Sequence, residues 1–181
     1  MNLQLLSIGK LDGRLLEDLA PALSNIFGLP CQVASSRLNP EFAFHAERQQ
    51  YHSSEILARM KDTTPFDCWR VLGITALDLY IPILTFVFGE AQMGGRCAVV
   101  SLNRLRQEFY GLPEDRNLLG ERLLKESVHE LGHTVNLTHC EDYRCAMAPS
   151  HAVEWIDLKE SWLCSACHGK VFEDAPRSGR R

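Results

Sequence analysis

The sequence predicts a mixed α/β fold in which a twisted sheet packs against helices. Three observations support this prediction. Short apolar runs typical of buried strands alternate with segments of helical periodicity through the first half of the chain. The pair Gly94-Gly95 separates two of these runs and indicates a hairpin, so the last strands of the sheet are expected to be antiparallel. A long amphipathic helix follows and carries a group of histidines.

The elements follow one another in a regular order. Leucines at helical spacing predict a helix over residues 11–26, which Gly28 ends. Residues 37–52 are expected to be mainly loop, and Ser54 is the expected N-cap of a helix that runs through Met60. The strands are expected at residues 3–8, 31–35, 69–75, 85–89 and 97–102.

Length and composition predict one soluble domain, residues 1–181. The chain has 181 residues, of which 45% are hydrophobic and 23% charged, as in ordinary globular proteins. A net charge of −4 argues against a broad nucleic-acid-binding surface. The most apolar span, residues 71–88, contains Asp78 and Pro82 and is therefore not a membrane helix. No basic and then apolar leader opens the chain, so we expect a cytoplasmic protein.

The stretch from His129 to His133, with Glu130 between them, has the spacing of a zinc site with an open position. An α-helix advances ~100° per residue, so two histidines four residues apart lie on one face and can share an ion. Glu130 flanks the same face, where a carboxylate can contact a water molecule at the metal. The HExxH pattern also occurs by chance on ordinary solvated helices, so it does not decide the matter alone.

His139 is the expected third ligand. A continued helix would carry it ~240° around the axis and ~9 Å along it from His133, away from the ion. The helix must therefore end between them, and Asn136 is of a residue type that enters the left-handed region at low cost. The helix is expected to begin between residues 117 and 121. Its opposite face carries an apolar stripe that predicts packing on a core: Leu124, Val128, Leu131 and Val135.

Four of the seven cysteines cluster late in the chain and predict a second, structural zinc. Cys164 and Cys167 form a CxxC pair, and Cys140 with Cys145 completes a closed tetrahedral set of thiolates. A redox CxxC or two disulfides are the alternatives, but the pair lacks a thioredoxin-like context. Because neighbouring side chains of an extended segment point to opposite sides, this zinc would hold the segment that delivers His139. The other cysteines are expected to be buried as small hydrophobic residues: Cys31, Cys68 and Cys97.

Residues 140–181 are expected to form a small zinc-stapled subdomain beside residues 1–139, which hold the sheet and the active-site helix. Met147 can form an apolar floor beneath the three histidines. His151 is a candidate transition-state donor, with a plain surface position as the alternative. The remaining histidines are expected at the surface: His45, His52 and His168.

This combination of residues resembles the archaemetzincins, a metzincin-clan family of zinc metalloproteases. The residues that carry the resemblance are HExxHxxxxxH at 129–139, Cys140, Cys145, Met147, Cys164 and Cys167. Upstream segments that are also similar to the family are 72–75, 78–80, 86–89 and 99–105. The usual pattern has glycine where this chain has Asn136, and we expect a left-handed asparagine to substitute at small cost.

The resemblance implies a metzincin-like catalytic domain with a twisted mixed sheet, an active-site helix and a Met-turn. It also implies that one catalytic and one structural zinc are present in each chain. The catalytic zinc would lie on His129, His133 and His139, with Glu130 as the base. The structural zinc would lie on the four clustered cysteines, namely Cys140, Cys145, Cys164 and Cys167.

The predicted function is zinc-dependent hydrolysis of peptide bonds in a peptide or protein substrate. Three neutral imidazoles leave a fourth position for water, whose pKa the ion lowers to ~7. Glu130 would take a proton from that water and pass it to the leaving amine. An extended peptide is expected to add to the sheet edge along residues 85–91. The alternatives are a non-hydrolytic zinc protein that binds peptides or a partner through an imperfect first site, and a hydrolase of non-peptide amides.

Overall fold

The structure, a computed structural model, describes residues 2–34, 38–64 and 68–174. Among these residues, a five-stranded sheet has the order β2-β1-β5-β8-β7. Its strands are β1 (Leu3–Ile8), β2 (Cys31–Ala34), β5 (Arg70–Thr75), β7 (Gly89–Ala91) and β8 (Cys97–Ser101). The first four strands in this order run parallel, whereas β7 pairs with β8 in the antiparallel sense. The predicted mixed sheet with an antiparallel end is therefore confirmed.

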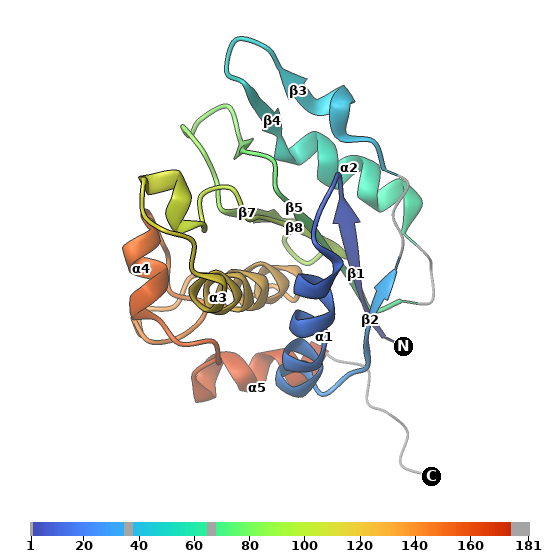
Figure 1. Ribbon diagram of the computed structural model, residues 1–181. Coiled ribbons are helices and arrows are strands. Elements are labelled where there is room, and N and C mark those ends of the chain that lie inside the picture. Colours follow the sequence, from blue (N-terminus) through green and yellow to red (C-terminus); the bar gives the residue numbers. More distant parts are fainter. Residues whose placement is uncertain (1, 35–37, 65–67, 175–181) are drawn as a thin grey trace.

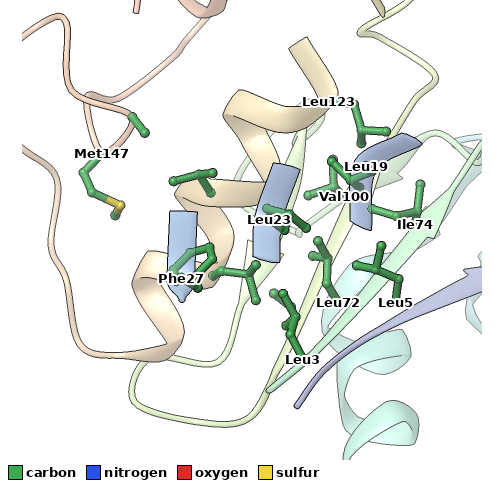
Figure 2. Close-up of a cluster of buried hydrophobic side chains, with 14 of the residues drawn as sticks. Leu3, Leu5, Leu19, Leu23, Phe27, Leu72, Ile74, Val100, Leu123 and Met147 are labelled. Carbon is green, nitrogen blue, oxygen red and sulfur yellow. The ribbon is translucent and has the colours of Figure 1, made fainter. Parts of the chain in front are cut away.

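Helices cover both faces of this sheet (Figure 1). Helices α1 (Gly13–Phe27) and α3 (Arg116–Thr134) pack on one face, and α2 (Ser53–Thr63) packs on the other. The larger core lies under α1 and α3, and Figure 2 shows part of it. Its labelled members are Leu3, Leu5, Leu19, Leu23, Phe27, Leu72, Ile74, Val100, Leu123 and Met147. Because Met147 belongs to this cluster, the C-terminal segment continues the same core.

Helix α1 ends as its sequence predicts. Gly28 has a φ of 64°, a left-handed conformation that glycine adopts without strain, and its N–H donates to Ser24 O. Asp12 provides the N-cap by accepting from the backbone of Arg14. Strand β2 ends at Ala34, and residue 35 of the predicted strand lies outside the described residues.

The predicted loop over residues 37–52 is wrong in its described part. It contains the 3-10 helix η1 (Pro40–Ala43) and the strands β3 (Phe44–His45) and β4 (Gln50–His52). These strands form a second small sheet in the order β3-β4-β6, with β6 at Leu79–Tyr80. Strands of two or three residues are too short to show a period of two, so no sequence pattern indicates them.

Two other boundaries differ from the prediction. The strand expected at residues 85–89 is wrong, because the strand of the main sheet begins only at Gly89. Val87 instead forms a bridge to Leu79 of the small sheet. The apolar alternation there serves ring packing, with the Phe86 and Phe88 centroids 5.1 Å apart. Helix α2 begins at Ser53, so its N-cap is His52 and not Ser54.

The C-terminal part packs against α3, with α4 beside that helix (Figure 1). The C-terminal part contains α4 (Val153–Leu158) and α5 (Ser165–Asp174). Another short element, the 3-10 helix η2 (Gln107–Tyr110), precedes α3. No helix among the described residues is long and apolar enough to cross a membrane.

Candidate active site and metal centres

Helix α3 has defined ends that position the site. Asp115 accepts a hydrogen bond from Leu118 N at 2.9 Å and so caps the helix, which begins at Arg116, one residue before the predicted start region. At the other end Asn136 has a φ of 63°, and Leu137 N donates to Gly132 O at 3.0 Å. A left-handed residue followed by this bond is a Schellman motif, here with asparagine in place of glycine. The predicted reversal at Asn136 is therefore confirmed.

The reversal brings three histidines together. The metal-binding atoms of His129, His133 and His139 all lie within 4.8 Å of one another, and Nε2 of His129 is 3.1 Å from Nε2 of His133. Two nitrogens bound at ~2.0–2.1 Å to a tetrahedral ion are about 3.3 Å apart, so this spacing fits zinc. His129 is buried and His139 is exposed, which leaves the cluster open on one side.

Backbone carbonyls hold two of these imidazoles. His129 Nδ1 lies 2.8 Å from Ala146 O, and His133 Nδ1 lies 2.7 Å from Leu137 O. Because a carbonyl oxygen only accepts, each Nδ1 carries the proton, and each Nε2 presents a lone pair. Two lone pairs facing each other at this distance repel unless a cation lies between them. The donor set therefore fits a metal ion that needs neutral imidazole ligands.

The surroundings keep these histidines neutral. Burial lowers the pKa of His129 well below its ordinary value, and the positive charge of Lys159 lowers it further. Burial is also the main cause of the lowered pKa of His133 and of His139. An imidazole with a lowered pKa holds no extra proton at neutral pH, so it is available as a ligand.

Glu130 lies beside the histidines, between α3 and the edge strand. It is 6% exposed, and burial raises the pKa of its carboxyl well above the usual value, with a further contribution from Glu126. Gly89 of β7 lies against it, because a Cβ at that glycine would come within 2.7 Å of Glu130 Cγ. The strand thus leaves just enough space for a buried carboxyl group next to the histidine cluster.

The four late cysteines also converge. The sulfurs of Cys140, Cys145, Cys164 and Cys167 lie within 4.8 Å of one another, and Cys140 Sγ is 3.8 Å from Cys164 Sγ. Four thiolates at ~2.3 Å from a tetrahedral zinc have sulfurs about 3.8 Å apart, whereas a disulfide bond is ~2.05 Å long. No disulfide joins any of the seven cysteines in the described part of the chain. The spacing therefore fits a metal site and excludes the predicted alternative of two disulfides in this structure.

Residues 145–148, here called the Met147 loop, connect the two clusters. Ala146 O contacts His129 Nδ1, as described above, and Cys140 N donates to Met147 O at 3.0 Å. Met147 packs directly on α3, because any Cβ at Gly132 would overlap its sulfur. Met147 therefore packs on the turn of α3 that carries His129 and His133, and the otherwise unfavourable glycine inside the helix makes room for it. An apolar floor beneath the three imidazoles stays a prediction.

Other predicted residues lie apart from the two clusters. His151 is exposed, and its ring centroid is 5.7 Å from that of Trp155, while its charge contributes to the lowered pKa of His139. Cys68 and Cys97 are buried as expected, but Cys31 is only half-buried. Of the other histidines predicted at the surface, His45 and His168 are exposed, whereas His52 is half-buried.

Sequence reasoning missed several residues of the site. Glu126 and Lys159 form a buried ion pair beside Glu130, and Gly89 and Gly132 supply the space described above. Glu126 had a signal, because a position four residues before Glu130 lies on the same helix face. Lys159 had no such signal, because it lies in a polar segment and lysine side chains are normally exposed.

Comparison with known proteins supplies the family. The family model described as "Peptidase family M54" matches residues 27–173. The chain belongs to this family, the archaemetzincins. An archaemetzincin of Methanocaldococcus jannaschii is 38% identical over 164 residues, which cover 91% of this chain and 89% of that protein. An archaemetzincin of Pyrococcus abyssi is 37% identical over 180 residues, or 94% of each chain.

Solved structures agree with this membership. The crystal structure of the Methanopyrus kandleri archaemetzincin has a TM-score of 0.84 and 34% identity, covering 96% of this chain and 94% of that one. A zinc-dependent peptidase from Methanocorpusculum labreanum has a TM-score of 0.86 and 27% identity, covering 94% of this chain and 100% of that one. The M54 chain described here is therefore a zinc metallopeptidase that acts on peptide or protein substrates.

Proposed function

We propose that this metallopeptidase binds a catalytic zinc through His129, His133 and His139 and uses Glu130 as its general base. The observation that carries the proposal is the pair of facing Nε2 atoms, 3.1 Å apart, with the third imidazole beside them. The carbonyl contacts of both Nδ1 atoms support it, because they fix the tautomer that zinc requires.

The chain's own residues provide the proton transfer. Zinc, when bound, supplies Lewis-acid chemistry that lowers the pKa of water to ~7 and polarises a peptide carbonyl. Glu130 takes the proton of the attacking water and delivers it to the leaving amine. Its burial suits this role, because a carboxylate in a dry site holds a proton more readily than one in bulk solvent.

The edge strand β7 is the proposed substrate platform. In the sheet order β7 stands at one end, so its outer edge is open to pairing within the described part of the chain. An extended peptide that adds to this edge forms backbone hydrogen bonds that fix its register. Since Gly89 lies against Glu130, a peptide along Gly89–Ala91 would pass the proposed base. This corrects the longer edge predicted over residues 85–91.

The four cysteines are proposed to hold a second, structural zinc, for two zinc ions per chain. This ion would anchor Cys140 and therefore the preceding His139, and its binding energy would contribute to folding. We further propose that the Met147 loop is the Met-turn of a metzincin, and that residues 1–139 and 140–181 act as one catalytic domain. Unpaired clustered thiols also favour a reducing, cytoplasmic location.

The Glu130→Gln variant tests this function. Glutamine keeps the size and shape of glutamate, but its amide cannot act as a base and accept the proton. We expect two zinc ions per chain, an unchanged thermal midpoint and a loss of peptide turnover of about a hundredfold or more. Zinc content and turnover on a peptide library measure these outcomes. Retained peptidase activity would refute Glu130 as the base, and an inactive, fully zinc-loaded wild type would favour the non-hydrolytic alternative.

A further inference from the structure

Lys159 lies almost entirely inside the protein, directly after the end of α4 at Leu158. Its side chain is 1% exposed, and its Nζ lies 2.8 Å from Glu126 Oε1, whose side chain is 4% exposed. The contact is an ion pair between an ammonium and a carboxylate, so each group compensates the charge of the other. Burying a lysine is costly and is tolerated only when its charge is compensated and its donors are used.

The same ammonium group also holds the Met147 loop. Lys159 Nζ donates to Ala148 O at 3.2 Å. Two residues earlier in that loop, Ala146 O accepts from His129 Nδ1 at 2.8 Å. Lys159 is thus connected to the first histidine through three consecutive residues of backbone.

The partner of Lys159 stands on the helix that carries the site. Glu126 is one turn before Glu130 on α3, so the two side chains share one face of the helix. The charges of the pair act on Glu130, and the charge of Lys159 also acts on His129. Met147 in turn packs on Gly132 of the same helix. The loop is therefore fixed to α3 at two places, by the Met147 side chain and by the Lys159–Glu126 pair.

A second ion pair joins the same elements but does not contact the loop. Arg122 of α3 donates to both carboxylate oxygens of Asp157 in α4, at 2.7 and 2.6 Å. This pair offers a direct comparison. If Lys159 only attached α4 to α3, loss of either pair would have the same consequence for the histidine site.

We propose that Lys159 is a positioning residue for the three-histidine site: paired with Glu126, it fixes the Met147 loop on α3 and so holds Ala146 O where it orients His129. The inference rests on the proposed zinc site. A carbonyl that orients a ligating imidazole contributes to metal affinity, and loss of such a partner typically weakens binding ~10–100-fold.

The test uses the full-length double variant Glu126→Leu, Lys159→Met, which replaces the buried pair by apolar groups. Such replacements often leave stability unchanged. With the four-cysteine site kept filled, we expect zinc affinity at the three-histidine site to fall at least tenfold, at an unchanged thermal midpoint. The NMR signal of the His129 Nδ1 proton should exchange faster with water. The control Asp157→Asn should leave both the affinity and this signal unchanged.

Each outcome has a separate meaning. If the wild type binds no zinc on its histidines, the proposed function fails; if it does and the double variant binds equally tightly, only the role of Lys159 is overturned. Equal losses in the double variant and in Asp157→Asn would also overturn it, because they indicate a general clamp. Should the apolar pair prevent folding, the variant Glu126→Gln, Lys159→Gln removes both charges with polar groups retained. Its shorter side chain at position 159 should not reach Ala148 O. Comparing its zinc affinity and His129 signal with those of Asp157→Asn then tests the role of Lys159.

Discussion

Gly89 of the edge strand lies against Glu130 of the active-site helix, and no other residue type fits there without displacement. A Cβ at Gly89 would come within 2.7 Å of Glu130 Cγ and 2.8 Å of its Oε1, and also within 2.7 Å of the backbone oxygen of Val99. Real Cβ atoms do not approach so closely, so either the glutamate or the strand would have to move. The platform proposed for substrate and the proposed base are therefore in direct contact.

Gly89→Ala should reduce turnover at least tenfold, because it displaces the Glu130 carboxyl group that positions the attacking water. Zinc content should stay at the wild-type value, since the three histidines are untouched. The matched control is Gly120→Ala in α3, where a Cβ meets nothing within 4 Å. That control should keep full activity and raise the free energy of unfolding by ~0.5–1 kcal/mol. Wild-type turnover in Gly89→Ala would show that the contact has no role.

The left-handed conformation of Asn136 should limit which residues are accepted there. With a φ of 63°, a β-branched side chain is strained, so Asn136→Val should lower the free energy of unfolding by ~1–2 kcal/mol. It should also weaken zinc binding by displacing His139. Asn136→Gly should preserve both properties. Urea unfolding and zinc titration measure the two effects, and normal zinc affinity in Asn136→Val would contradict the link between this residue and His139.

Zinc affinity at the three histidines should depend only weakly on pH between 7 and 6. Burial is the main cause of the lowered pKa of His129, His133 and His139, so each is less protonated near pH 6 than a solvated imidazole. Three unperturbed imidazoles would lose about thirtyfold in apparent affinity over this step. We expect a clearly smaller loss, measured by competition with a chelator calibrated at each pH. A thirtyfold loss would mean that the site holds ordinary, solvated histidines.

Removing one ligand of the four-cysteine cluster should affect both metal centres. Cys167→Ser should lower zinc content by at least one ion per chain and lower the thermal midpoint, because zinc binding at this site contributes to folding. Affinity at the histidines should also fall, since Cys140 follows His139 directly. Cys31→Ser, outside both clusters, is the control and should keep both ions. Unchanged zinc content in Cys167→Ser would remove the structural zinc from the account.

The sequence alone predicted the geometry of the histidine cluster better than the contacts that hold it in place. The spacing of His129 and His133 on one helix face, and the need for a turn at Asn136, follow from helix geometry, and both are present. Spacing cannot reveal Ala146 O, because a backbone carbonyl is the same at every residue. The burial of Lys159 could not be predicted from the sequence either, because only tertiary packing places a lysine in the interior.

The fold shows the same division between strong and weak signals. Strands β1 and β5 and helix α1 were predicted because apolar patterns that extend over six or more residues carry a strong signal. The small sheet escaped prediction, since β3 and β6 contain two residues each. The false strand before Gly89 arose from Phe86 and Phe88, whose alternation matches a strand but serves a ring pair.

The most direct test of the central claim is anomalous diffraction at the zinc edge from crystals of the zinc-loaded protein. The account predicts two zinc peaks per chain. One should lie ~2.0–2.1 Å from nitrogens of His129, His133 and His139, and the other ~2.3 Å from the four cysteine sulfurs. A single peak among the sulfurs, with no zinc between the three imidazoles, would contradict it.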